Sequence, residues 1–214
     1  MCSIFGVETR SIPYAQIQES FDQTVSRGPD SSKLIEVPCG WLGFHRLAIM
    51  GLNEKGMQPF ELDGSCVVCN GELYGFRPIR ERLKAHYEFK SESDCEILLP
   101  LYREYGLEMF RTLDAEFALI LYDAQRGSFV AARDPIGIRP LYYGRTADGS
   151  MAFASEPKNL VALCDEVLPF PPGCYCEAFA STTEYDHAQV DQFVMEDEAT
   201  VCRRLHELLT AGVE

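Results

Sequence analysis

The sequence has no long apolar run and few basic residues. No stretch reaches the roughly 18 consecutive apolar residues of a membrane-spanning helix, and the opening MCSIFGVETR lacks the basic flank and apolar core of a signal peptide. Lysine and arginine total 19 against 33 acidic residues, which gives a formal net charge of −14. This balance argues against nucleic acid or an anionic membrane as a partner, because both need a basic patch. We therefore expect a cytoplasmic protein.

A complete set of zinc ligands is also missing, although the chain has nine cysteines. Disulfides are not expected in a reducing compartment, and the count is odd. Cys66 and Cys69 have the spacing of a zinc knuckle, but they lie in an apolar, strand-like run where residues three apart point to opposite faces. Cys174 and Cys176 share a face, yet no histidine or second cysteine pair completes four ligands. We expect no metal site and mostly small, buried, apolar cysteines.

Helical and strand-like patterns follow one another without internal repeats. Helical spacing of apolar residues predicts helices at 14–27, 76–87 and 93–106, the last with Ser93 or Asp94 as its N-cap. Short β-rich runs predict strands at 2–7, 40–50, 66–75, 140–144, 151–155 and 173–179, and a hairpin at 116–134. Because helices are grouped before and between hairpins, we expect an α+β fold of antiparallel sheets with helices packed outside.

The chain divides into three predicted parts. Residues 2–180 carry the strands and helices of one domain, and the polar stretch 181–194 is interpreted as a linker or surface arm. Residues 195–214 predict the start of an amphipathic helix. Its apolar residues fall on one helical face: Val201, Leu205, Leu208 and Leu209.

Cys2 stands directly after the initiator methionine, and small residues in that position normally let the methionine be removed. Cys2 would then carry a free α-amine and a thiol on one residue. A thiolate is a strong nucleophile toward amide carbonyls but needs a base to take its proton. The reference pKa of an α-amine, roughly 7.7–8.0, makes it a suitable base near neutral pH. The pattern therefore predicts nucleophilic acyl transfer by Cys2.

Such chemistry needs an oxyanion hole, and an amino-acid substrate needs partners for its charged groups. Asn70 and Gly71 offer a side-chain amide and an unobstructed backbone N–H, although Asn-Gly is also a hairpin signal. Arg46, flanked by apolar residues, suits a carboxylate, and Asp94 suits an ammonium group. An internal salt bridge for Arg46 and a helix cap for Asp94 are the alternatives, and from these residues alone both stay open.

Together these segments resemble the glutaminase domain of glutamine-dependent asparagine synthetase, a class II glutamine amidotransferase of the N-terminal nucleophile hydrolase group. The resemblance covers roughly residues 2–180. It is carried, in order, by MCSIFG, RGPD, GFHRLAIM, GMQPF, CNGELYG, SDCEIL, LDAEFALILYD, ARDPIGIRPLYYG and FASEPKNL. Gly75 departs from this pattern, since an asparagine usually follows the tyrosine.

The resemblance implies a four-layer α-β-β-α sandwich of two antiparallel sheets that hydrolyses glutamine to glutamate and ammonia. It implies the following roles: Cys2 as nucleophile, Asn70 and Gly71 as oxyanion hole, Arg46 for the α-carboxylate, Asp94 for the α-ammonium with help from Glu72, and backbone groups near Leu47 and Ile49 lining the pocket. L-Glutamine would be the substrate, and the ammonia would serve asparagine synthesis.

The resemblance also implies a partner. Asparagine synthetases continue into an ATP-dependent domain with a Ser-Gly-Gly-x-Asp-Ser loop, a motif this sequence lacks. We expect residues 195–214 to lead toward that domain, and ATP and Mg²⁺ to belong to it, with no cofactor in this chain. Three alternatives stay open: a non-catalytic glutamine-binding or docking module if Met1 is retained, the glutaminase domain of a different amidotransferase, and a homodimer as the assembly.

Overall fold

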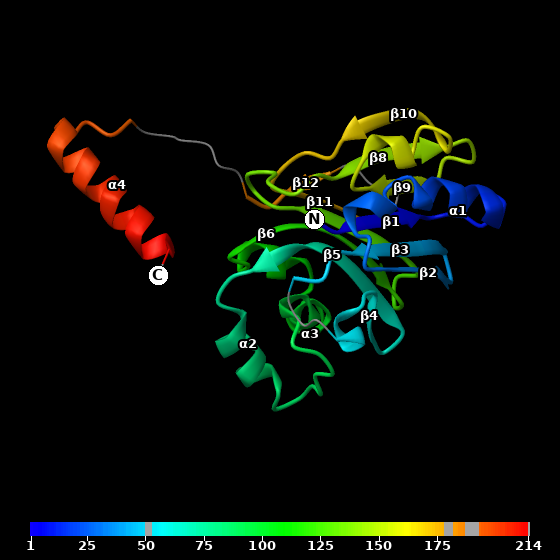
Figure 1. Cartoon of the computed structure of the whole chain (residues 1–214), viewed down its shortest axis with the longest axis horizontal. Helices are drawn as coiled ribbons and strands as arrows, with labels where there is room; N and C mark the ends of the chain where they lie inside the picture. The colour runs from blue at the N-terminus through cyan, green and yellow to red at the C-terminus, as the bar shows by residue number, and fades with distance from the viewer. Residues whose placement is uncertain (50–52, 178–181, 187–192, 214) are drawn as a thin grey trace.

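The computed structural model describes residues 1–49, 53–177, 182–186 and 193–213, and its strands form two antiparallel sheets (Figure 1). In the first sheet the order is β10 (Cys164–Pro169), β8 (Tyr142–Thr146), β9 (Met151–Ala154), β1 (Ser3–Val7), β3 (Gly40–Arg46) and β2 (Ser31–Val37). In the second sheet the order is β12 (Thr183–Glu184), β11 (Cys174–Glu177), β7 (Ser128–Arg133), β6 (Ala115–Asp123), β5 (Ser65–Leu73) and β4 (Phe60–Leu62).

The two sheets stack face to face around a core of apolar side chains. β1 illustrates the packing, since successive side chains of a strand point to opposite faces. Ile4 lies in the core between the sheets, whereas Phe5 and Val7 pack with Ile17 and Phe21 of α1 (Tyr14–Asp22). Every residue of β1 is therefore buried.

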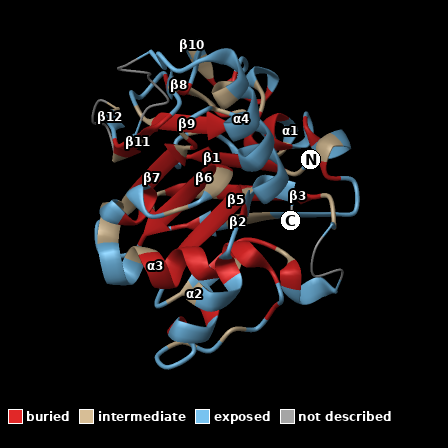
Figure 2. Cartoon of the chain, turned by 90° about the vertical axis from the view of Figure 1, so that its left-hand side faces the viewer, coloured by how far each residue is buried: buried red, intermediate tan, exposed pale blue. Residues whose placement is uncertain are grey.

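Helices also cover the outer face of the second sheet. α2 (Phe76–Leu83) and α3 (Leu98–Tyr105) pack there, and buried residues run through α3 and the strands beneath it (Figures 1 and 2). The alternation predicted for two cysteines is confirmed, because Cys66 belongs to the core between the sheets and Cys69 to the core under α3. The order helix, sheet, sheet, helix is the predicted four-layer sandwich.

The predicted hairpin and helices form, with shifted boundaries. β6 and β7 pair through a turn in which Gly127 adopts a left-handed φ of 69°. The first predicted helix ends at Asp22 and is followed by a 3₁₀ helix at Val25–Arg27. The helix predicted over 93–106 begins as a separate 3₁₀ helix at Asp94–Ile97, which α3 follows.

Neither predicted cap of that helix acts as one. Ser93 stands at the N-cap position of the 3₁₀ helix, but its side chain makes no capping bond. Its hydroxyl instead donates to Asp94 Oδ1 at 3.4 Å, and Asp94 Oδ2 accepts the backbone N–H of Leu73 at 2.8 Å. The helix-cap interpretation of Asp94 is therefore wrong, because its carboxylate is held against β5.

The C-terminal residues divide into a packed and an exposed part. Tyr185, next to β12, is buried against Phe110, and its hydroxyl donates to the carbonyl of Arg133 at 2.7 Å. The predicted last helix forms as α4 (Glu198–Val213), has no buried residue, and stands apart from the sandwich (Figure 1). Among the described residues, no helix combines the length and apolar character needed to cross a membrane.

Candidate active site

All eight residues predicted for the site line one pocket of about 140 Å³. This pocket, called the Cys2 pocket below, draws its residues from the ends of strands in both sheets and from the 3₁₀ helix Asp94–Ile97. The predicted residues that it brings together are Cys2, Arg46, Leu47, Ile49, Asn70, Gly71, Glu72 and Asp94. Cys2 and Asp94, which are 92 positions apart in the chain, thus share one cavity.

Cys2 directly precedes β1, and the end of β3 holds its sulfur. Its Sγ accepts the backbone N–H of Leu47 at 3.4 Å and lies 3.5 Å from the carbonyl oxygen of the same residue. Burial raises the pKa of the Cys2 thiol above its ordinary value, and the Leu47 N–H partly offsets this by stabilising the thiolate. A nearby base is therefore needed to remove the thiol proton.

Met1 lines the same pocket, half exposed at its edge. Its sulfur accepts a hydrogen bond of 2.8 Å from Arg139, whose guanidinium is also paired with Glu116. While Met1 is attached, the nitrogen of Cys2 is an amide without basicity. Removal of Met1 would create the α-amine and clear part of the pocket in one step.

Asn70 and Gly71 lie within a continuous strand. β5 pairs with β6 in unbroken register from Cys66 to Leu73, so the hairpin-turn interpretation of Asn-Gly is wrong. Asn70 is 3% exposed, and its Nδ2 is buried without a hydrogen-bond partner in the part of the chain that the structure describes. Leaving a buried amide donor unpaired costs about 1–3 kcal/mol, so a donor in this state fits a group that awaits an acceptor.

Gly71 is required by close packing. A Cβ at this position would lie 2.6 Å from the backbone oxygen of Glu116 and 2.8 Å from the Cβ of Phe117 on β6. Gly75 is required by conformation, because it adopts a left-handed φ of 60° just before α2. Asparagine also tolerates that region better than most residues, so the departure at Gly75 conserves the backbone shape.

Arg46 and Asp94 present opposite charges to the pocket. Arg46 ends β3, is 6% exposed, and donates to the backbone oxygen of Asn53 at 2.8 Å. Asp94 is equally buried and is anchored to Leu73. Glu72 lies exposed on β5, and the side chain of Ile49 is also largely exposed. The roles of these residues stay predictions.

Two further residues shape the site, and the sequence reasoning assigned neither of them a role. Gln58 is buried, and its side chain clamps the backbone of Cys69, accepting from the N–H at 2.6 Å and donating to the carbonyl at 3.1 Å. Arg27 donates to the carbonyl of Cys2 at 3.1 Å and pairs with Glu156 at 3.0 Å. The motifs GMQPF and RGPD, which carry them, were the available signals.

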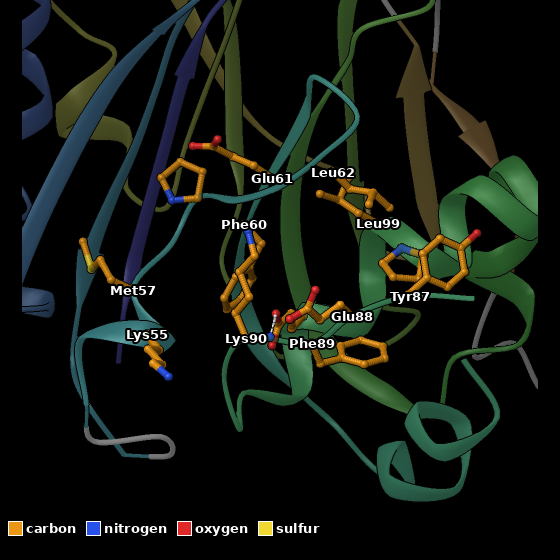
Figure 3. A pocket seen from close by; sticks show the side chains of 13 residues that line it. Lys55, Met57, Phe60, Glu61, Leu62, Tyr87, Glu88, Phe89, Lys90 and Leu99 are labelled. Carbon is orange, nitrogen blue, oxygen red and sulfur yellow. Dashed lines mark hydrogen bonds between the residues drawn. The ribbon is translucent and has the colours of Figure 1, made fainter. Parts of the chain in front are cut away.

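A second cleft of about 200 Å³ lies beside the segment Met57–Phe60 and contains none of the predicted residues. Gly56 and Gln58 line the Cys2 pocket, whereas Met57 and Pro59 line this second cleft. Figure 3 shows Phe60 and Phe89 on one side of it and Met57 on the other. The same segment of chain therefore forms a wall of both cavities.

Two solved structures share this arrangement of sheets and helices. The first is glutamine phosphoribosylpyrophosphate amidotransferase from B. subtilis, complexed with ADP and GMP, with a TM-score of 0.69 at 15% identity. The second, the allosteric regulatory enzyme of purine biosynthesis, gives a TM-score of 0.72 at 15% identity. Each match covers 86% of this chain and 49% of the other. This likeness concerns the fold alone, and it confirms the predicted α+β sandwich of two antiparallel sheets with helices packed outside.

The chain belongs to the glutamine amidotransferase domain family, whose model matches residues 1–201. Its relatives include the probable asparagine synthetase (glutamine-hydrolysing) of Schizosaccharomyces pombe, 45% identical over 162 residues, which are 73% of this chain and 29% of that protein. Asparagine synthetase (glutamine-hydrolysing) 2 of Arabidopsis thaliana is 40% identical over 178 residues, which are 81% of this chain and 31% of that protein. The chain thus spans less than a third of these relatives, and the resemblance stated from the motifs is confirmed.

Proposed function

We propose that this chain hydrolyses L-glutamine to glutamate and ammonia through a thioester on Cys2. We further propose that the ammonia serves asparagine synthesis by an ATP-dependent synthetase. The observation that carries the first proposal is the Asn70 Nδ2 donor, which has no partner among the described residues and belongs to a buried side chain lining the same pocket as the Cys2 thiol. The second is supported by relatives of 40–45% identity that are named asparagine synthetases.

The first half of the reaction forms the thioester. After loss of Met1, the α-amine of Cys2 takes the thiol proton, and the thiolate attacks the side-chain carboxamide carbon of glutamine. The oxyanion that forms accepts hydrogen bonds from Asn70 Nδ2 and the Gly71 N–H. Collapse of this intermediate breaks the carbon–nitrogen bond, and the protonated amine gives its proton to the departing ammonia.

The second half releases glutamate. The neutral amine takes a proton from water, which attacks the γ-glutamyl thioester at the same carbon. The oxyanion forms again between Asn70 and Gly71, the carbon–sulfur bond breaks, and the departing thiolate takes the proton from the protonated α-amine. Arg46 and Asp94 bind the α-carboxylate and α-ammonium throughout, which fixes the side-chain amide beside the sulfur.

The synthetase portion is proposed as the partner of this domain. ATP and Mg²⁺ would act there, and no step of glutamine hydrolysis on this chain uses them. The charge of −14 makes nucleic acid or an anionic membrane an unsuitable partner, and a cytoplasmic location remains our proposal. A homodimer is a further proposal for the assembly of this chain.

A second candidate function is a non-catalytic glutamine-binding or docking module. This function applies if Met1 is retained, because a retained methionine leaves Cys2 without its base and occupies part of the Cys2 pocket. A third is the glutaminase domain of a different amidotransferase. The 40–45% identity to asparagine synthetases favours asparagine synthesis over that alternative.

The test combines intact mass, labelling and turnover on the purified chain. We expect the mass of the chain without Met1, stoichiometric labelling of Cys2 by a glutamine-like diazoketone, and glutamate release at the rate of ammonia release. Cys2→Ala should abolish both release and labelling while the thermal unfolding temperature stays within about 2 °C, since one small half-buried side chain replaces another. Active protein that retains Met1, or glutamate release by Cys2→Ala, would refute the mechanism.

A further inference from the structure

The carboxylate of Asp94 belongs to a hydrogen-bonded unit that extends away from the Cys2 pocket. Leu73 N–H donates to Oδ2 at 2.8 Å, and the Ser93 hydroxyl donates to Oδ1 at 3.4 Å. Ser93 and Asp94 are both buried and both line the pocket. The position of this carboxylate therefore depends on the loop that leads into Ser93.

Glu96 holds that loop in place through three hydrogen bonds. Its Oε1 accepts the backbone N–H of Lys90 at 2.7 Å, and its Oε2 accepts the N–H and the hydroxyl of Ser91 at 2.8 and 2.7 Å. Ser91 Oγ in turn accepts the backbone N–H of Ser93 at 3.1 Å. An unbroken series of hydrogen bonds thus joins Glu96 through Ser91 and Ser93 to Asp94.

A second clamp acts on the same loop from α2. The guanidinium of Arg80, which is 7% exposed, donates to the carbonyl of Ser91 and lies 4.9 Å from the ring centre of Phe89. Phe89 and Lys90 line the second cleft, where Figure 3 shows them, and Glu96 lines it too. Glu96 therefore faces the second cleft while the residue it supports, Asp94, faces the Cys2 pocket.

We propose that Glu96 is a positioning residue for the α-ammonium group of glutamine. The proposal rests on the proposed function, in which Asp94 binds that group. Glu96 does not touch the substrate; its carboxylate supplies acceptors to two backbone N–H groups and one hydroxyl, which fixes the course of residues 90–93 and hence the Asp94 carboxylate. Bonds to an ionised acceptor are about twice as strong as neutral ones, so a neutral replacement weakens the whole unit.

Glu96→Gln tests this directly, because it keeps the shape but turns one acceptor oxygen into a donor that faces N–H groups. We expect the KM for glutamine to rise about tenfold with kcat within about twofold, since the ammonium contact is made equally in the ground and transition states. Glu88→Gln is the matched control: it removes an exposed carboxylate from the same loop and should leave both constants unchanged.

A substrate without the α-ammonium group separates positioning from general damage. Hydrolysis of glutaramate, which is glutamine lacking that group, should change less than about twofold in Glu96→Gln, because Asp94 has no ammonium to bind. Asp94→Asn combined with Glu96→Gln should be no worse than Asp94→Asn alone, since both act through one group. Equal losses on glutamine and glutaramate, or an unchanged KM for glutamine, would overturn the proposal.

Two additions keep the test decisive. Ser91→Ala is the substitute variant if Glu96→Gln does not fold. It retains the backbone N–H bonds to Glu96 but interrupts the link to Ser93, so it should raise the KM for glutamine by a smaller factor than Glu96→Gln. Calorimetric binding of glutamine in the Cys2→Ala background gives a Kd that does not require turnover. If the wild-type chain binds but does not hydrolyse glutamine, the proposed function fails. The positioning proposal is then tested by whether Glu96→Gln raises the Kd for glutamine in the Cys2→Ala background.

Discussion

At the scale of single residues, the side-chain Nδ2 donors of two buried asparagines differ in their hydrogen bonding. Asn159 Nδ2 donates to the carbonyls of Ser20 and Phe21 and to the Thr24 hydroxyl, at 2.7, 3.2 and 3.0 Å. Asn70 Nδ2, which is also buried, has no partner among the described residues. Asn159 Oδ1 is itself buried without a partner among the described residues, so the contrast concerns the two Nδ2 donors. The bonds of Asn159 Nδ2 stabilise the fold, whereas Asn70 Nδ2 is proposed to donate to the charge that develops on the substrate.

This contrast predicts reciprocal effects of the same substitution. Asn70→Ala should lower kcat for glutamine by about 10²–10³-fold, the usual effect of losing one oxyanion donor, with an unfolding temperature no lower than that of the wild type. Asn159→Ala should leave kcat of the folded chain unchanged but destabilise it by about 1–3 kcal/mol, because its loss strands buried acceptors. Steady-state kinetics and thermal unfolding of both variants decide this, and a near-normal kcat for Asn70→Ala would remove it from the oxyanion hole.

At the scale of elements, β5 joins structure and chemistry. It is a central strand that pairs with β6 throughout, and its residues alternate between the two cores until Asn70 and Gly71 reach the Cys2 pocket. Gly71 serves both strand packing and the proposed oxyanion hole, and β6 leaves no space for a side chain at this position. Any larger residue must push the strands apart at the point where the proposed oxyanion hole lies.

Gly71→Ala should therefore impair both stability and activity. A Cβ at 2.6 Å from a backbone oxygen cannot be relieved by a side-chain rotation, so we expect a loss of about 1–3 kcal/mol in the free energy of unfolding, and a lower kcat. Gly212→Ala in α4 is the control, because a Cβ there meets nothing within 4 Å. Urea unfolding and glutamine turnover measure the two effects; an unaltered midpoint for Gly71→Ala would contradict the packing argument.

Strand periodicity and motif order were enough to predict much at this scale. The opposite faces of Cys66 and Cys69 follow from a period of two, and the ordered motifs selected eight residues that the fold brings into one pocket. The supporting contacts were not predictable. Gln58 bonds the backbone of Cys69, and Arg27 that of Cys2, 11 and 25 residues away. Such partners depend on how strands and loops come together, which neither local propensity nor spacing contains.

The same limit explains the error at Ser93 and Asp94. Local rules favour serine or aspartate as the N-cap of a helix, and both residues stand where such a cap belongs. The backbone N–H of Leu73 on β5 competes for the Asp94 carboxylate at 2.8 Å. A tertiary partner thus replaces the local one, and the helix starts as a 3₁₀ turn.

At the scale of the whole molecule, the sandwich and α4 differ in how much they contribute to buried packing. The division at residues 180 and 194 stays a prediction, and the described contacts give it a test. Tyr185 packs on Phe110 and bonds Arg133, although it lies within the predicted arm, whereas α4 buries no residue. Stability of the sandwich should thus depend on the residues around β12 and not on the last helix.

Two truncations test this. Removing residues 194–214 should leave the unfolding temperature and glutamine turnover unchanged, because no described residue of α4 is buried. Ending the chain before Thr183 removes β12 and Tyr185, and should cost about 3 kcal/mol, the usual effect of deleting a large buried aromatic side chain. Scanning calorimetry compares the two chains. Equal unfolding temperatures would place the true boundary near residue 180, as the sequence predicted.

The pocket lies where the two sheets meet: Cys2 directly precedes the interior strand β1 of the first sheet, and Asn70 lies on β5 of the second. Because the proposed nucleophile and the proposed oxyanion donor come from different sheets, the rate of glutamine hydrolysis should depend on how the two sheets are positioned relative to each other. A substitution that shifts one sheet against the other by a fraction of an ångström should lower glutamine turnover well before it causes the fold to unfold. Glutamine turnover should therefore be a more sensitive measure of the packing between the two sheets than the unfolding temperature.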